Sequence, residues 1–85
     1  MSSFRYPRVG DLVRFEFWKS HRRVVIDGIV LGSRKNPRKP AVFSGRWGGF
    51  VGCYVENALN GRRECVPWTQ DDSVVTMTIL QGALV

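Results

Sequence analysis

The residues of this chain that best indicate a function are its basic residues and some of its aromatic residues, and the function they indicate is the binding of a polyanion. Residues 1–46 contain eleven of the thirteen Lys and Arg and three acids, a net charge of +8, whereas residues 47–85 have a net charge of −2. Arg outnumbers Lys ten to three, and a guanidinium binds phosphate bidentately and stacks on bases. The basic half favours nucleic acid as the partner, with these candidate binding residues: Lys19, Arg22, Arg23, Arg34, Lys35, Arg38, Lys39, Arg46 and Trp47.

Most of these cations belong to two loops expected at the two ends of one strand. Residues 33–40 hold four cations together with Pro37 and Pro40, and we expect the prolines to keep this loop extended so that the cations project outward. The other loop spans residues 19–22. A strand of this length separates the two loops by ~25–30 Å, so they need not form one patch. The alternative interpretation of such a charge run is a solvated loop that keeps a small protein soluble.

A glycine-rich segment, residues 45–50, places Arg46 and Trp47 among three glycines. Such a segment could lay an aromatic ring and a planar cation on unstacked bases. The alternative is a turn between two strands, with Trp47 or Phe50 closing one end of the fold. Trp18 presents the same choice, since it is either a plug at the end of the fold or an exposed contact residue.

Catalytic and metal-binding patterns are weak in this sequence. His21 is the only histidine, and with Cys53 and Cys65 it lacks the spacing of a closed zinc site or a family signature for a nucleophile pair. There is no phosphate-cradling loop of the Walker or Rossmann kind. We therefore expect no enzymatic activity, no catalytic residues, no metal and no cofactor.

The apolar residues alternate with a period of two, which predicts strands. Asp11–Phe17 shows the pattern of a half-buried strand, and Gly28 within the second strand suggests a bulge or bend. Six short strands without a helical window predict a closed or nearly closed, largely antiparallel barrel in one domain, residues 1–85, with residues 1–8 as a candidate flexible basic arm. The expected strands are residues 11–17, 23–31, 41–44, 50–56, 62–67 and 74–80.

The two cysteines are expected to be free thiols. Asn60-Gly61 is a strong signal for a two-residue type I′ turn, which would place Glu56 opposite Cys65 and Val55 opposite Val66. Because strand side chains alternate between faces, Cys53 and Cys65 then lie on opposite faces and cannot bond. One helical turn over residues 57–60 is the alternative, and it would move this register.

The segment Val9-Gly10-Asp11-Leu12-Val13, followed later by Asp27-Gly28-Ile29-Val30, resembles the opening hairpin of SH3-like small barrels of the KOW and Tudor type. The resemblance covers residues 9–31. It implies a five- to six-stranded SH3-like barrel and suggests a KOW-like function. The sequence departs from the KOW pattern at Phe17 and Trp18, where the family tends to have glycine.

No apolar stretch approaches the ~18–20 residues of a membrane span, and the first ten residues do not have the pattern of a secretory signal. We therefore expect a non-catalytic, cytoplasmic nucleic-acid-binding protein, for DNA or RNA, with no membrane partner. The rival is a protein-binding module, such as a small phage-type inhibitor or accessory subunit, that docks on an acidic protein surface or a larger assembly. The apolar residues 79–85 favour this rival, because they could add a strand to a partner's sheet.

Overall fold

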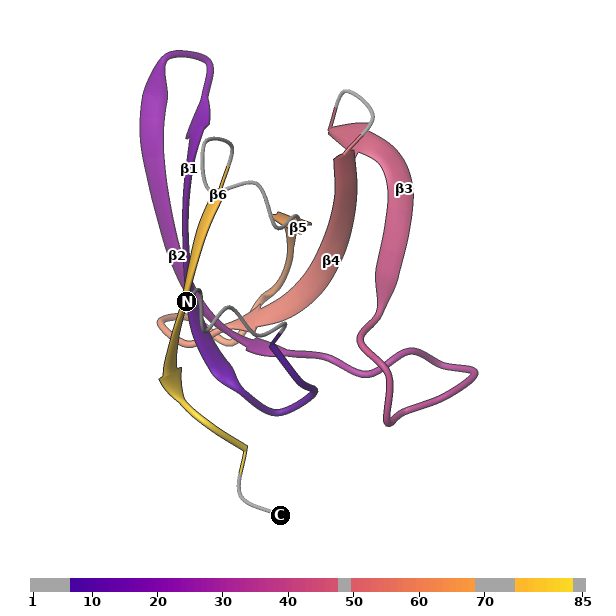
Figure 1. Cartoon of the computed structure of the whole chain (residues 1–85). Coiled ribbons are helices and arrows are strands. Elements are labelled where there is room, and N and C mark those ends of the chain that lie inside the picture. The colour runs from indigo at the N-terminus through magenta and orange to yellow at the C-terminus, as the bar shows by residue number, and fades with distance from the viewer. Residues whose placement is uncertain (1–6, 48–49, 69–74, 84–85) are drawn as a thin grey trace, which may run out of the picture.

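The structure, a computed structural model, describes residues 7–47, 50–68 and 75–83, with the backbone alone for residues 43–47 and 50–51 (Figure 1). The described residues form six strands and no helix, which confirms the all-β prediction, and each expected strand is present with ends that differ by at most three residues. The strands are β1 (Leu12–Lys19), β2 (Arg22–Val30), β3 (Val42–Trp47), β4 (Phe50–Asn57), β5 (Arg63–Trp68) and β6 (Val75–Gln81).

The strands form one antiparallel sheet in the order β3-β4-β2-β1-β6, with β5 paired to β4. β4 pairs with β5 along one edge and with β2 and then β3 along the other, so it bends between two walls of the fold (Figure 1). One wall contains β1, β2 and β6, and the other contains β3 and β4. No ladder joins β5 to β6 within the described ranges, so the sheet is barrel-like in its curvature and is not closed. Of the closed or nearly closed barrel that we expected, the closed form is therefore not reached.

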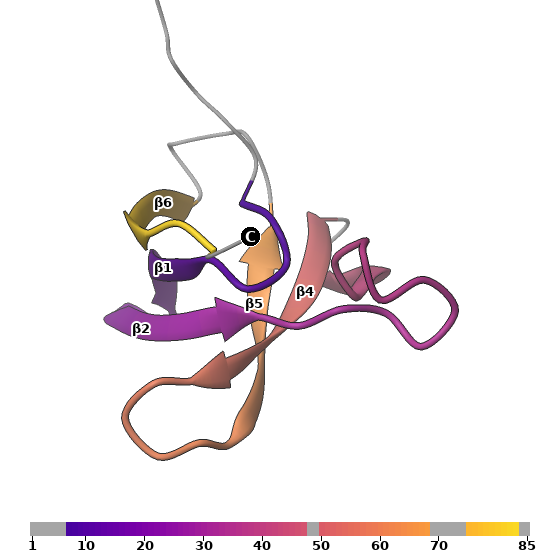
Figure 2. The ribbon, with the colours of Figure 1, turned by 90° about the horizontal axis from the view of Figure 1, so that it is seen from below.

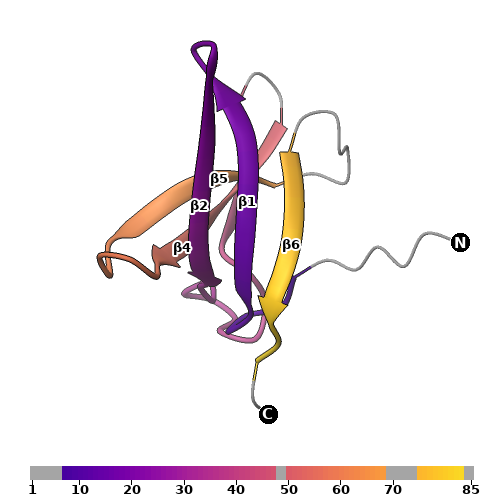
Figure 3. The ribbon, with the colours of Figure 1, turned by 90° about the vertical axis from the view of Figure 1, so that its left-hand side faces the viewer.

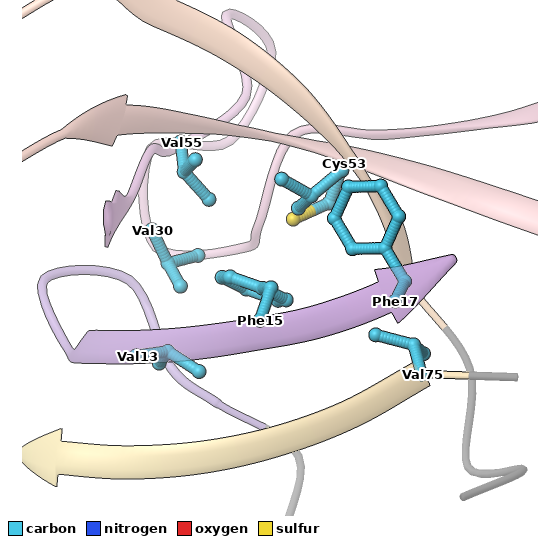
Figure 4. Close-up of a cluster of buried hydrophobic side chains, with 8 residues drawn as sticks. Val13, Phe15, Phe17, Val30, Cys53, Val55 and Val75 are labelled. Carbon is cyan, nitrogen blue, oxygen red and sulfur yellow. The ribbon is translucent and has the colours of Figure 1, made fainter. Parts of the chain in front are cut away.

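The core lies between these walls. On β1 the side chains of Val13, Phe15 and Phe17 point inward and are almost completely buried, while Arg14 and Glu16 alternate with them on the outer face. This is the period of two that the sequence shows. The core is completed by Val30, Cys53, Val55, Val66 and Val75 (Figure 4).

Gly28 lies at a point where β2 and β4 approach each other closely. Of the bulge or bend that we expected at Gly28, the bulge is absent, because the register between β1 and β2 is unbroken there. A register shift lies instead between Leu12 and Val13, where β1 pairs with β6. A Cβ atom on Gly28 would lie 2.7 Å from Cγ2 of Val55 on β4. Glycine is therefore required because β4 crosses β2 closely at this point.

The connection between β4 and β5 differs from the expected two-residue turn. The Gly61 N–H donates to the Asn57 carbonyl at 2.8 Å, which forms one helical turn, and the Leu59 N–H donates to Asn57 Oδ1 at 2.8 Å. Gly61 follows with φ of 71°. The helical turn that was the alternative is thus the one formed, because the Asn57 side chain caps it.

The resulting β4–β5 register differs by two residues from the expected one, and Tyr54 instead of Glu56 faces Cys65. A shift of two keeps every side chain on its expected face. Cys53 is buried in the core, Cys65 is half-buried on the other face, and both are free, as expected.

The two-residue turn occurs elsewhere, between β1 and β2. Lys19 pairs with Arg22, and the two residues between them, Ser20 and His21, have φ of 49° and 63°. Positive φ at both central positions is the mark of a type I′ turn, whose twist matches that of the flanking strands. Its usual Asn-Gly sequence is absent here, so the sequence predicts only a short polar loop.

Candidate nucleic-acid interface

The basic loop, residues 33–40, is a folded structure and not the extended segment that we expected from its prolines. The Ser33 N–H donates to the Lys39 carbonyl at 2.9 Å, and the Lys39 N–H donates to the Asn36 carbonyl at 2.9 Å. Asn36 and Pro37 therefore begin a tight turn, in the positions that Asn and Pro favour. Two side chains stabilise it, because Ser33 Oγ accepts from the Asn36 N–H and Asn36 Oδ1 accepts from the Arg38 N–H.

The base of the basic loop is attached to the sheet. Gly32 and Pro40 form a bridge, the Ala41 N–H donates to the Leu31 carbonyl, and the Tyr54 N–H donates to the Ala41 carbonyl. A Cβ atom on Gly32 would lie 2.4 Å from the carbonyl oxygen of Pro37. Only glycine lets the tip of the loop fold back on its base in this way. The loop consequently projects from the body of the sheet between β2 and β3 as a structured unit (Figure 2).

All four cations of the basic loop are exposed, as the expectation of outward projection requires: Arg34, Lys35, Arg38 and Lys39. None of them makes an ion pair with an acid among the described residues. Two ion pairs between described residues are on the outer face of β1 and β2, between Arg14 Nε and Asp27 Oδ1 at 2.8 Å and between Arg23 Nη2 and Glu16 Oε1 at 3.1 Å. The basic loop is thus a local concentration of uncompensated positive charge.

The second group of predicted residues lies at the tip of the β1–β2 hairpin. Lys19, Arg22 and Arg23 are all exposed there, and Arg23 is partly neutralised by Glu16. The tip and the basic loop lie at opposite ends of β2 (Figures 1 and 3). The structure therefore does not bring the two groups into one patch. Trp18, beside Arg23 in the register, is 69% exposed, so it is an exposed residue and not a plug.

Arg46 and Trp47 are the last two residues of β3, and the backbone of Trp47 pairs with Phe50 on β4. The glycine-rich segment therefore joins two antiparallel strands, which agrees with this part of the structural alternative, whereas the closing of one end of the fold by Trp47 or Phe50 concerns side chains outside the described part. The side chains of Arg46 and Trp47 lie outside the described part of the structure, as do residues 48–49, so their stacking on bases stays a prediction.

Sequence reasoning missed a groove beside the basic loop. Its volume is about 1070 Å³, and it is bounded by the start of the described chain, by the loop, by β3 and β5 and by Ala83, the second residue after β6. Its lining residues include Arg8, Arg38, Lys39, Val42, Trp68 and Ala83. These residues come from four parts of the chain that are far apart in the sequence, and no local pattern could have grouped them.

A buried carboxylate holds two walls of the groove together. Asp11 is 1% exposed, its Oδ2 accepts from the Arg8 N–H at 2.8 Å and its Oδ1 accepts from the Ala83 N–H at 2.7 Å. Gly10, with φ of 91°, allows the chain to turn sharply before this aspartate. The Gly-Asp pair on which the family resemblance rests thus has a structural role, which joins the beginning of the described chain to its end.

The groups considered for catalysis and metal binding are dispersed. His21 is in the exposed hairpin turn, whereas Cys53 is in the core, where burial raises the pKa of its thiol far above the ordinary value. The described residues contain no cluster of three or more His, Cys, Asp or Glu that could hold a metal ion. They also contain no helix long and apolar enough to cross a membrane.

Comparison with known proteins finds no family model, no curated protein and no solved structure that matches this chain.

Proposed function

We propose that this protein binds nucleic acid through phosphate contacts made by the basic loop, and that it does so without catalysing a reaction. The observation that carries the proposal is the loop itself: four exposed cations on a hydrogen-bonded framework, none paired with an acid within the described residues. A solvated loop that only maintains solubility does not need this internal framework. Phosphate contacts of this kind position the protein without selecting a sequence.

Two physical features of the basic loop favour binding. Its cations need not leave an intramolecular ion pair before they meet a phosphate, in contrast to Arg23 at the hairpin tip. Its backbone is already ordered, so less conformational entropy is lost on binding than with a disordered segment. The hairpin tip at the other end of β2 would contribute secondary contacts through Lys19 and Arg22 where the nucleic acid is long enough to reach it.

We also propose that the protein is a member of the SH3-like barrels of the KOW and Tudor type and that it is located in the cytoplasm. The family membership is supported by the opening hairpin β1–β2 and by the positive φ of Gly10 and the burial of Asp11 within the resembling segment. In such barrels the loops at the ends of strands are the natural places for binding residues.

A salt titration of binding to random-sequence DNA and RNA tests the proposal. If all four loop cations meet phosphates on duplex DNA, the plot of log K against log salt concentration should have a slope of about −3 to −4 from the loop alone. Arg34→Ala/Lys35→Ala and Arg38→Ala/Lys39→Ala should each flatten the slope by about two units.

The matched control is Arg62→Ala/Arg63→Ala, which removes the same charge from exposed residues at the start of β5. This variant should leave the slope nearly unchanged. An equal effect of all three double variants would show that the loop has no special role, and no measurable affinity of the wild type for DNA or RNA at low salt would refute nucleic-acid binding.

The rival function, docking on another protein, has one structural observation in its favour. Within the described residues β6 pairs only with β1, so its second edge is available to a partner strand, and Leu80 on this strand is 42% exposed. Residues 84–85 of the apolar tail lie outside the described part. Binding to a protein through this edge should depend little on salt, which distinguishes it from the phosphate contacts in the same titration.

A further inference from the structure

We propose that the groove beside the basic loop receives an unstacked base of single-stranded nucleic acid, so that the protein prefers single strands to duplex. This inference deepens the proposed function and rests on it. It concerns residues that the phosphate-contact argument does not use: Arg8, Val42 and Trp68.

The shape of the groove suits a nucleotide. Its volume of about 1070 Å³ is slightly above the ~300–1,000 Å³ typical of small-molecule sites. The wall is formed largely by apolar residues, among them Val42, which is 51% exposed on β3, and Trp68 at the end of β5. Trp68 packs against the core residue Phe15, with the ring centroids 6.5 Å apart, so its indole is held in place. A held indole can stack on a base with little loss of side-chain entropy.

The positive charges at the groove favour an anionic ligand. Arg8, Arg38 and Lys39 all line it and are exposed, and among the described residues that line it none is acidic. The occupant must therefore combine a planar or apolar group with negative charge. A nucleotide within a strand meets both requirements, with its base against Val42 and Trp68 and its phosphates against the three cations.

The basic loop favours a nucleic acid strand over an acidic peptide. Beyond Arg38 and Lys39 the loop continues to Arg34 and Lys35, which are exposed but do not line the groove. Cations that extend away from the groove match a polymer with one phosphate per residue better than a short cluster of carboxylates. A duplex would satisfy these cations but would keep its base faces stacked and unable to enter the groove.

The walls of the groove are fixed before any ligand binds. Asp11 binds the backbone N–H groups of both Arg8 and Ala83, and the turn at Asn36 fixes the opposite wall through its hydrogen bond from Lys39. A site with walls held in this way does not need to be ordered by the ligand, which favours affinity.

The decisive test compares Val42→Glu with Val25→Glu. The two valines are 51% and 49% exposed, both are on strands, and Val25 lies on the outer face of β2 and does not line the groove. Both variants add one negative charge at an exposed strand position, but only Val42 lines the groove with Arg38 and Lys39. The comparison with an abasic polymer therefore separates the loss of base contacts at Val42 from the repulsion of phosphates by the new glutamate. Val42→Glu should weaken binding of a short single-stranded oligothymidylate by about ten-fold or more, whereas Val25→Glu should weaken it by no more than about two-fold.

A second probe separates bases from phosphates. An abasic deoxyribose-phosphate polymer of the same length carries the same charge, and the wild type should bind it more weakly than the oligothymidylate, while the Val42→Glu variant should bind both alike. In a Trp18→Phe/Trp47→Phe background Trp68 is the only tryptophan, and the oligothymidylate should quench its fluorescence while the abasic polymer should not.

The outcomes distinguish this inference from the function on which it rests. Salt-dependent binding with equal effects of the two glutamates, or equal affinity for the abasic polymer, would overturn the groove assignment and leave phosphate binding intact. Absence of any nucleic-acid binding would overturn both the groove assignment and the proposed function. Binding of an acidic peptide in the groove without binding of any oligonucleotide would also overturn both.

Discussion

Replacement of Asp11 by Asn should destabilise the protein far more than the loss of one charge suggests. The carboxylate is 1% exposed and uses its two oxygens to accept two backbone N–H groups, from Arg8 at 2.8 Å and from Ala83 at 2.7 Å. An amide keeps one oxygen and turns the other into a donor. That new donor would face a partly buried backbone N–H group that has lost its acceptor, whichever way the amide is oriented.

The magnitude follows from these contacts. A hydrogen bond to a charged group contributes about 1.5–3 kcal/mol, and the donor left unpaired in a buried site adds its own cost, so the loss is about 2–4 kcal/mol. The expected stability of a domain of 85 residues is only about 4–13 kcal/mol. For a domain of this size each kcal/mol lowers Tm by about 4–8 °C, so Tm should fall by roughly 10–30 °C.

Thermal unfolding followed by circular dichroism measures this difference, and Asp27→Asn is the matched control. Asp27 accepts two hydrogen bonds from Arg14, but both side chains are more than one third exposed, so water replaces most of what the substitution removes and the Tm loss should be small. Equal Tm losses in the two variants would refute the role assigned to Asp11. A normal Tm for Asp11→Asn would show in addition that its two backbone contacts do not hold the chain ends together.

The strands could be predicted because each carries its own signal. Val13, Phe15 and Phe17 alternate with polar residues on β1, and burial of one face is sufficient to fix the strand, its register parity and its inward side. Even the wrong register at the β4–β5 hairpin placed Cys53 and Cys65 on their correct faces, because the error was of two residues.

The loops could not be predicted in the same way, because their conformations depend on side-chain contacts that local preference does not show. Asn60-Gly61 has the strongest type I′ preference in the chain, yet Asn57 captures the Leu59 N–H and forms a helical turn instead. The type I′ geometry forms at Ser20-His21, where the pairing of β1 with β2 imposes it on residues that rarely adopt it.

The candidate site, too, could be predicted from the sequence only in part. The exposed cations of the basic loop could be found from composition, since charged residues next to prolines remain at the surface. The groove could not be found, because Arg8, Val42 and Trp68 become neighbours only through the curvature of the sheet. The separation of the two basic clusters followed from strand length alone.

The remaining predictions concern thiols, acid and the shape of the basic loop. Cys53 and Cys65 should both react with a thiol reagent after denaturation without reductant, and Cys53 should be protected in the native protein, because burial raises the pKa of its thiol; a need for reductant would contradict this. Hydrogen bonding from Arg14 lowers the pKa of Asp27 from its ordinary 3.8, so the pair stabilises the fold above that value and loses its effect as the pH falls through the lowered pKa. The small Tm difference between the wild type and Asp27→Asn should accordingly shrink as the pH falls through the lowered pKa of Asp27, and a difference that acid does not change would show that the ion pair is not its source. Gly32→Ala changes no charge but would bring a Cβ atom to 2.4 Å from a backbone carbonyl in the loop, so the loop must open. If phosphate binding needs the folded loop, this variant should bind DNA several-fold more weakly at an unchanged salt slope with the sheet intact by circular dichroism, whereas wild-type affinity would show that the cations act without the framework that holds them.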